Sequence, residues 1–435
     1  MKFTAVGDII ISRRIQENFA GYGELSEIIG RGDVRFFNLE TTLNKEGECY
    51  ASEASGGTWL RTNPEVLDDV KKFGFNMTSF NNNHAMDFSF EGLLKTLESV
   101  ENSGLVHAGV GRNLAEASAP KYLETEQGRV ALISVNTTLM GQMIAGEQTG
   151  RMRGRPGINP LRVNQHVELE QEDFATLQRI VKKTGINVQR EIEKREGYHG
   201  GANSSIETVG GVNFVCGETT RRVRRCDGRD LERVKNAIYE ASLQADYIMV
   251  SLHSHEIGAT EKEEPADFAE EFARFCIDHG ANAVVGHGPH LLRPIEIYKN
   301  CPIFYSLGDF VLQLYNIEYA PGDFYEQYGL DSKTTVHELL KKRSKDFSIG
   351  LMTDKRMFEA VIPYWETENG KLKHLKLYPI RLAMTGNKSE TGLPRLEKNA
   401  EFMADFAKRC ERYGTKLLKN PDGSYECRWN DGDSL

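Results

Sequence analysis

The chain has 435 residues, of which 39% are hydrophobic and 27% charged, and its formal net charge is −9. This composition is typical of a soluble globular protein and excludes wholesale disorder. The negative charge argues against a protein that binds long nucleic acids through a broad basic surface. No run of 18 apolar residues occurs, so we expect no transmembrane helix and no membrane partner.

The cysteines indicate the compartment. All seven are widely scattered and none forms a C-x-x-C pair, which predicts reduced thiols rather than a disulfide framework or a zinc knuckle. The first eight residues contain one lysine and an apolar stretch that is too short for a signal peptide. We therefore expect a cytoplasmic protein.

The first 135 residues alternate between strand-like and helix-like segments. Apolar spacings of three and four residues predict helices, and short β-branched or apolar runs predict strands. The predicted elements are strands at 2–6 and 34–39, a helix at 64–73, a strand at 75–80, a helix at 90–102 and a strand at 130–135. This alternation predicts an α/β fold.

The regular pattern is interrupted at about residues 140–215, which we interpret as an insertion. It resumes with helices at 231–244 and 268–279 and strands at 247–252, 283–285 and 303–307. Near the C-terminus, Asn369-Gly370 predicts a hairpin turn between 358–365 and 372–382, and a helix is expected at about 396–413. We therefore divide the chain into a domain at 1–315, interrupted by the insertion, and a C-terminal region at 316–435.

Metal-binding residue types follow six of the strand-like runs directly. Carboxyl ends of strands in an α/β sheet converge on one crevice, so residues far apart in sequence can meet there. The residues are Asp8; Asn38 and Glu40; Asn83, His84 and Asp87; His253, His255 and Glu256; His287 and His290; and Asp309. Carboxylates, amides and imidazoles are suitable ligands for Mn, Fe or Zn, and two such ions can activate water for hydrolysis.

Each of these residues also has an ordinary structural explanation. A single Asp after a strand is more often a turn or cap residue, and a lone His is more often a satisfied core or surface residue. Six coincidences at strand ends favour one joint site. Outside it, Arg153 and Arg155 flank a glycine-containing loop and could bind an anionic substrate.

At these positions the chain resembles the CapA family of poly-γ-glutamate capsule synthesis proteins, which is similar to the calcineurin-like metallophosphoesterases. The resemblance rests on the segments 6–8, 38–43, 82–87, 251–253, 285–290, 294–296 and 303–311. It implies a metallophosphoesterase-like α-β-β-α sandwich with two metal ions at one edge, and the insertion and the C-terminal appendage are added to that sandwich.

The resemblance also implies a role for each matching residue. Asp8 would hold one metal ion, Glu40 would bridge the two, and Asn83 would bind the second. His253 or His255, with His287 and His290, would complete the ligand set. His84 would be the general acid, and Asp87 would orient it.

The chain departs from the family pattern at several positions. Ile10 stands where metallophosphoesterases usually have a histidine, which leaves one metal ion a ligand short unless His255 or Asp309 supplies it. Gly288 replaces a second histidine, and Asp309 replaces an asparagine. We include Glu256 and Asp309, with Arg153 and Arg155, among the candidate substrate-binding residues.

These observations favour a hydrolase that uses two divalent metal ions, most simply Mn, Zn or Fe, to cleave a phosphoester or amide bond of a small anionic substrate. The alternative is a non-hydrolytic component of poly-γ-glutamate or capsule synthesis that binds an anionic polymer. Bound metal and turnover would favour the first, and polymer binding that persists after metal removal would favour the second.

Overall fold

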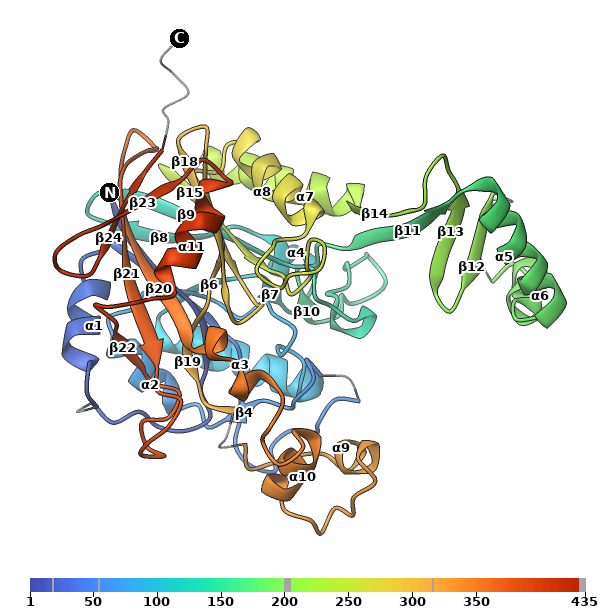
Figure 1. Cartoon of the computed structure of the whole chain (residues 1–435), viewed down its shortest axis with the longest axis horizontal. Helices are drawn as coiled ribbons and strands as arrows, with labels where there is room; N and C mark the ends of the chain where they lie inside the picture. The colour runs from blue at the N-terminus through green and yellow to red at the C-terminus, as the bar shows by residue number, and fades with distance from the viewer. Residues whose placement is uncertain (18, 54, 199–204, 315–316, 430–435) are drawn as a thin grey trace. The chain divides into compact units, whose positions relative to one another are not determined.

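The computed structural model describes residues 1–17, 19–53, 55–198, 205–314 and 317–429. The chain forms two compact units, one of Met1–Leu161 with Asp230–Leu435 and one of Arg162–Arg229 (Figure 1). The sequence predicts an insertion at about 140–215, and the separate unit begins and ends later, at 162 and 229. The predicted domain boundary at 315–316 lies outside the described residues.

The first sheet of the main unit is built around the N-terminal strand. In this sheet β1, β2, β5 and β6 are parallel neighbours. The C-terminal end of β1 also pairs in parallel with β19, and the N-terminal end of β1 pairs antiparallel with β20. The strands are β1 (Lys2–Ile10), β2 (Val34–Leu39), β5 (Met77–Ser79), β6 (Val106–Ala108), β19 (Asp309–Leu312), β20 (Glu359–Glu368), β21 (Lys371–Leu382), β22 (Pro394–Leu396), β23 (Lys416–Lys419) and β24 (Tyr425–Arg428).

The second sheet has six strands in the order β17-β18-β16-β15-β9-β8, with its central four parallel. These strands are β8 (Lys121–Thr125), β9 (Gly128–Asn136), β15 (Tyr247–His253), β16 (Ala283–His287), β17 (Leu292–Tyr298) and β18 (Cys301–Leu307). Short two-stranded pairs complete the unit: β3 (Thr42–Leu43) with β4 (Arg61–Thr62), and β7 (Val110–Gly111) with β10 (Gly157–Ile158).

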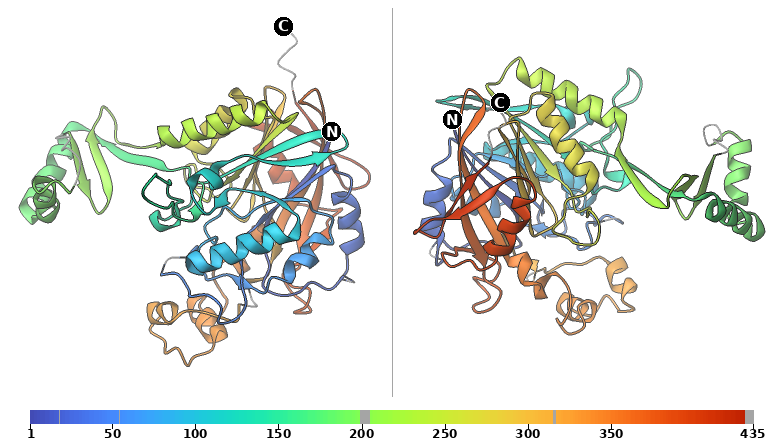
Figure 2. Two further views of the ribbon diagram at one scale, coloured as in Figure 1. Left: turned by 180° about the vertical axis from the view of Figure 1, so that it is seen from behind. Right: turned by 45° about the horizontal axis from the view of Figure 1, so that its top comes forward.

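Several helices cover the outer sides of the two sheets, whereas α11 packs into the apolar core between them and α9 and α10 pack in a smaller cluster of their own (Figures 1 and 2). The first sheet packs on α1 to α3, and α7 and α8 lie over the second sheet. The helices of the main unit are α1 (Tyr22–Ile29), α2 (Val66–Lys71), α3 (Ser89–Ser103), α4 (Leu114–Ser118), α7 (Gly228–Ser242), α8 (Asp267–Asp278), α9 (Gly322–Gln327), α10 (Val336–Arg343) and α11 (Met403–Glu411).

The two sheets enclose a common apolar core. Phe3 of β1 stacks on Trp365 of β20 at 5.0 Å between ring centroids, and the Trp365 indole N–H donates to the hydroxyl of Tyr247 on the opposite sheet. Trp365 and Tyr247 are almost completely buried. This layering confirms the predicted α/β sandwich.

The C-terminal region contributes strands to the first sheet. Its predicted hairpin is present, and Asn369 and Gly370 both have the positive φ angles, 53° and 74°, that such a turn requires. The helix expected from residue 396 is wrong at its start, because Pro394–Leu396 pairs with β21 and the helix begins at Met403. The C-terminal region, as far as Arg428, therefore extends the sheet that carries Asp8.

The separate unit, Arg162–Arg229, is a four-stranded sheet in the order β12-β13-β11-β14 with two helices. Its elements are β11 (Val163–Leu169), α5 (Gln171–Thr184), α6 (Val188–Arg195), β12 (Ile206–Val209), β13 (Val212–Cys216) and β14 (Arg221–Cys226). All seven cysteines lie within the described residues, and none of them is in a disulfide. Within the described residues, no helix is both long and apolar enough to cross a membrane.

Candidate metal centre

The candidate ligands meet where strands of the two sheets end. Asp8 lies near the end of β1 and pairs in register with Asn38 of β2 and with Asp309, the first residue of β19. On the other sheet, His253 and His287 are register partners at the ends of β15 and β16. The parallel strands therefore bring residues from distant parts of the sequence to one edge, as the sequence predicts.

Three histidines form the first part of the site. The Nδ1 atoms of His253 and His287 lie 2.8 Å apart, and the Nε2 atoms of His253 and His255 lie 3.1 Å apart. Burial and the neighbouring imidazoles lower the pKa of His253 and His255 well below the usual range, and burial lowers the pKa of His287 to about 3. These rings are therefore neutral, and neutral imidazole is the metal-binding form.

Asn83 completes this part of the site. Its amide oxygen lies 2.8 Å from Nε2 of His253. An amide oxygen beside neutral imidazoles is a donor set that a divalent cation can use.

Glu40 lies at the centre of the site. Its Oε1 atom is 3.9–4.0 Å from the Nε2 atoms of four histidines, namely His84, His253, His255 and His290. The side chain is fully buried, and neither carboxylate oxygen has a hydrogen-bond partner among the described residues. Burial, reinforced by the Asp8 carboxyl group, raises the pKa of Glu40 well above its usual value.

This environment fits a cation. A divalent ion with bonds of about 2.1 Å can join two atoms that lie up to about 4.2 Å apart. A buried carboxylate without a donor is unfavourable by itself, and a bound cation would remove that cost.

Asp8 is held in place by two donors. The side-chain amide of Asn38 donates to one carboxylate oxygen at 2.7 Å, and the backbone N–H of Gly288 donates to the other at 2.9 Å. Gly288 has a φ of +119°, and a Cβ there would lie 3.1–3.2 Å from Ser254 and the His253 ring. The family that the chain resembles has a histidine at this position, whereas the backbone here requires glycine. Burial and the nearby Asp309 raise the pKa of Asp8 to about 6.

Asp309 fixes the orientation of His290. Its Oδ1 lies 3.0 Å from Nδ1 of His290, which leaves Nε2 of that ring directed toward Glu40. Burial opposes protonation of His290, but Asp309 and Asp8 outweigh it and raise the pKa of the ring. The second oxygen of Asp309 is buried without a hydrogen-bond partner among the described residues.

Together these residues form three groups that could hold a metal ion: Asp8, His253 and His287; Glu40, His253 and His255; and Asp8, His290 and Asp309. Asp309 is therefore placed among the candidate metal ligands, on the strand that pairs with the one carrying Ile10. The donors are oxygen and nitrogen atoms, which suits Mn, Zn or Fe.

His84 and Asp87 form a separate pair beside Glu40. Nδ1 of His84 lies 2.6 Å from Oδ2 of Asp87, and Asp87 also accepts backbone N–H bonds from Leu60 and Gly56. This geometry fixes the His84 ring so that its Nε2 faces the site. The family resemblance implies that His84 is a general acid and that Asp87 orients it, and the contact between the two side chains is compatible with those roles.

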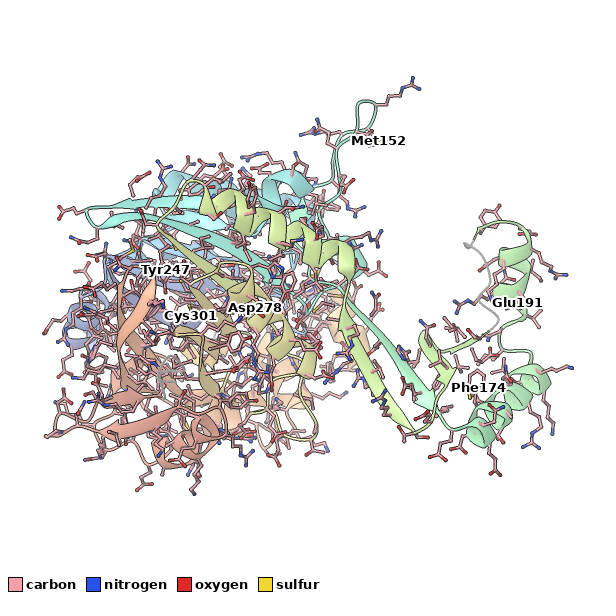
Figure 3. The ribbon with its side chains drawn as sticks, turned by 90° about the horizontal axis from the view of Figure 1, so that it is seen from above. Met152, Phe174, Glu191, Tyr247, Asp278 and Cys301 are labelled. Atoms are coloured by element: carbon pink, nitrogen blue, oxygen red, sulfur yellow. The ribbon has the colours of Figure 1, made fainter. Side chains whose placement is uncertain are left out.

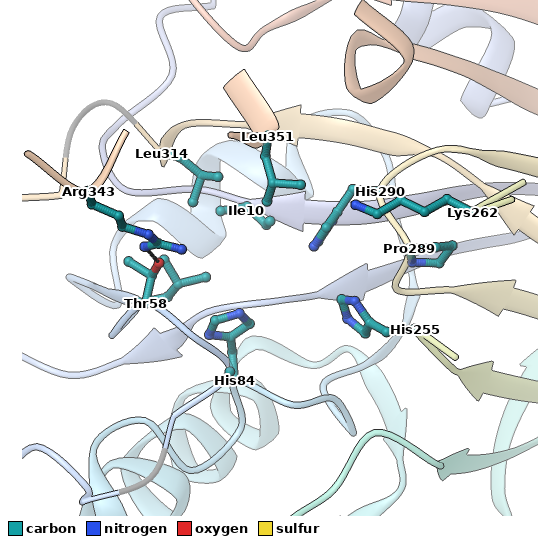
Figure 4. Close-up of a pocket in the computed structure, with 12 residues that line it drawn as sticks. Ile10, Thr58, His84, His255, Lys262, Pro289, His290, Leu314, Arg343 and Leu351 are labelled. Atoms are coloured by element: carbon teal, nitrogen blue, oxygen red, sulfur yellow. Dashed lines mark hydrogen bonds between the residues drawn. The ribbon is translucent and has the colours of Figure 1, made fainter. Parts of the chain in front are cut away.

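A cavity of about 160 Å³ opens over the histidines (Figure 4). His84, His255 and His290 line it, and two cationic side chains, Lys262 and Arg343, lie at its opposite ends. Arg343 donates to the Thr58 hydroxyl at 2.6 Å. Sequence reasoning missed both cations, because Lys262 lies in a charged loop and Arg343 on α10, and neither adjoins a recognisable motif.

The structure does not bring three predicted substrate-binding residues to this cavity. Arg153 and Arg155 are exposed, and the Arg155 guanidinium donates to the backbone carbonyl of Ile144. Figure 3 shows that the loop carrying Met152 extends away from the sheets. Glu256 accepts hydrogen bonds from three hydroxyl groups, those of Thr137, Thr138 and Ser254, and therefore holds the loop after β15.

Comparisons with known proteins agree with the motifs. The family model described as bacterial capsule synthesis protein PGA_cap matches residues 2–314. Two uncharacterized proteins of Sinorhizobium fredii (strain NBRC 101917 / NGR234) are each 32% identical over 428 residues, which cover 95% of this chain and 90% of theirs. The capsule biosynthesis protein CapA of Bacillus anthracis is 23% identical over 317 residues, 72% of this chain and 59% of CapA.

Among solved structures, a hypothetical protein from Thermus thermophilus aligns with 87% of this chain and 98% of its own. The identity is 11% and the TM-score 0.40.

Proposed function

The chain belongs to the PGA_cap family of bacterial capsule synthesis proteins, as its motifs predict, and from this premise we propose that it is a metal-dependent hydrolase. The reaction we propose is cleavage of a phosphoester or amide bond in a small anionic substrate. The observation that carries the proposal is Glu40, a fully buried carboxylate that four imidazoles surround and that has no hydrogen-bond donor among the described residues.

We propose that this site would hold two divalent ions, Mn, Zn or Fe. Asp8, His290 and Asp309 would hold one ion. Asn83, His253 and His255 would hold the other, and Glu40 would be shared. His287 lies on the opposite, Nδ1 side of the His253 ring and 3.6 Å from Asp8, so it would belong to the Asp8 side. Bound ions of this kind supply a Lewis acid and lower the pKa of water so that it can act as a nucleophile near neutral pH.

The protein's own side chains would perform the remaining tasks. His84, oriented by Asp87 through Nδ1, would donate a proton from Nε2 to the leaving group. Lys262 and Arg343 would hold the negative charge of the substrate at the two ends of the cavity. The volume of about 160 Å³ favours a small substrate or the end of a chain.

The substrate class and the cell compartment that we propose rest on the composition of the chain. The net charge of −9 disfavours long nucleic acids as substrates but permits nucleotides. Free thiols fit a reducing compartment such as the cytoplasm.

A second candidate function is supported by the printed name of the Bacillus relative, capsule biosynthesis protein CapA. In that case the chain would be a non-hydrolytic component of capsule or poly-γ-glutamate synthesis and would bind an anionic polymer. Lys262 and Arg343 would then contact the polymer without any turnover.

One experiment separates the two candidates. Purified protein is loaded with Mn, Zn or Fe and assayed on a panel of phosphoesters and γ-glutamyl amides, with Asn83→Ala and His287→Ala as variants. His279→Ala, at the exposed end of α8, is the matched control. We expect metal-dependent turnover that both site variants lower at least about 100-fold and the control retains. Full activity in the site variants would contradict the hydrolase proposal. Polymer binding that survives chelation, without turnover, would favour the second candidate.

A further inference from the structure

A second cavity adjoins the one over the histidines. It has a similar volume, about 160 Å³, and is lined mainly by apolar side chains, including Ile317, Leu340, Phe347 and Met352. The two cavities share four lining residues, Thr58, Leu314, Arg343 and Leu351. A molecule bound beside His84 could therefore extend directly into the second cavity.

The boundary between the cavities is cationic. Arg343 lines both, and its hydrogen bond to Thr58 holds its guanidinium group at the junction. Figure 4 shows Arg343 and Thr58 at one end of the first cavity, with Leu314 beside them and Leu351 between Leu314 and His290. An anionic group at this junction would be paired with Arg343, and an apolar group attached to it would meet hydrocarbon walls.

The wall of the second cavity includes an unusual backbone segment. Lys345, Asp346 and Phe347 are three consecutive non-glycine residues with positive φ angles of 48°, 59° and 58°. Such conformations cost free energy and persist where surrounding contacts impose them. Here the Phe347 N–H donates to the Ser344 hydroxyl and the Asp346 N–H donates to the Lys341 carbonyl, which holds Phe347 in the wall.

We propose that this apolar cavity is the specificity pocket of the metal site, and that the substrate is a small anion that carries an aryl or short branched alkyl group. The inference rests on the proposed function. An apolar cavity of about 150 Å³ can hold a benzene molecule, so one ring of that size fills the pocket. Burial of the ring supplies affinity that an anion with only a methyl group lacks.

The test compares two non-hydrolysable anions, phenylphosphonate and methylphosphonate, by calorimetric titration of the metal-loaded protein. We expect phenylphosphonate to bind at least about tenfold more tightly. In Leu340→Gln, which places an amide in the apolar wall and lies outside the first cavity, the preference should fall to about threefold or less while methylphosphonate binding is retained. Lys342→Gln, an exposed neighbour on the same helix, should change neither affinity.

The outcomes separate this inference from the proposed function. Equal binding of both phosphonates by the natural protein would overturn the specificity pocket and leave the metal site standing. A preference for the phenyl group that survives in a folded Leu340→Gln variant would also overturn it. If neither phosphonate binds the metal-loaded protein, the anion-binding metal site and the inference built on it both fail.

Discussion

Replacing Glu40 with glutamine should uncouple the stability of the protein from divalent metal ions. Glu40 is fully buried, and its Oε1 lies within 4.0 Å of four imidazole nitrogens. Glutamine keeps the shape but removes the charge that both proposed ions share. Without metal, burial raises the pKa of Glu40 and keeps the side chain largely neutral, so its replacement by a neutral amide of the same shape should leave the stability about unchanged.

The size of the stabilisation by metal follows from the thermodynamic linkage between ion binding and folding. An ion present at 100 times its dissociation constant stabilises the fold by about 2.7 kcal/mol, and two ions by about twice that amount. Unfolding entropy is about 2.1 cal/mol/K per residue, or about 0.8 kcal/mol/K for the roughly 370 residues of the main unit. The natural protein should therefore melt about 7 °C higher with metal, and the Glu40→Gln variant should show a shift near zero.

The assay is thermal unfolding of both proteins after chelation and again after addition of Mn, Zn or Fe. Glu53→Gln is the matched control, since Glu53 is exposed. It should keep the full metal-dependent shift. An equal shift in Glu40→Gln would refute the assignment of Glu40 as the shared ligand.

Three further predictions concern the pair beside the metal centre, the pH dependence and the core. Asp87→Asn weakens the 2.6 Å contact that orients His84, so turnover should fall about 10–100-fold. The metal content, measured by elemental analysis, should stay the same, and a loss of metal would contradict an orienting role. The pKa of Asp8 is about 6 in the metal-free fold against 3.8 for a free carboxyl group, so this group's contribution to stability is present below about pH 4 and is lost as pH rises to 6. Metal binding needs the ionised carboxylate, so the metal-induced melting shift should grow from about pH 5 to about pH 7, and a shift that shrinks would refute this. Trp365→Ala should lower the free energy of unfolding by about 3–5 kcal/mol in denaturant titrations, because it empties the space between the sheets, and a loss below about 1 kcal/mol would contradict that packing.

Much of the sandwich could be predicted because its signals are local. Alternation of short apolar runs with helical spacing indicated the strands and helices, and Asn369-Gly370 indicated the hairpin. The pairing of β20 with β1 could not be predicted, because it joins residues that lie near opposite ends of the chain. The helix expected from residue 396 failed because residues 394–396 find a strand partner in β21, and that tertiary pairing overrides local helical preference.

The metal-ligand candidates could be predicted for a different reason. Each lies at or just after the end of a strand. Parallel strand order brings Asp8 and Glu40 together in one sheet and His253 and His287 together in the other, and the packing of the two sheets joins the pairs. The cavity above them comes from loops and from α10, whose positions depend on packing. Lys262 and Arg343 therefore left no signal in the sequence, whereas Arg153 lies in an arginine-rich loop that the structure directs to solvent.

The metal content of the purified, metal-loaded and desalted protein, measured by elemental mass spectrometry, tests the central proposal most directly. We predict about two divalent ions per chain in the natural protein and clearly less than one in Glu40→Gln, with the folded state of both checked by circular dichroism. A ratio near zero in the natural protein, or an unchanged ratio in the Glu40→Gln variant, would contradict a dinuclear centre built around Glu40.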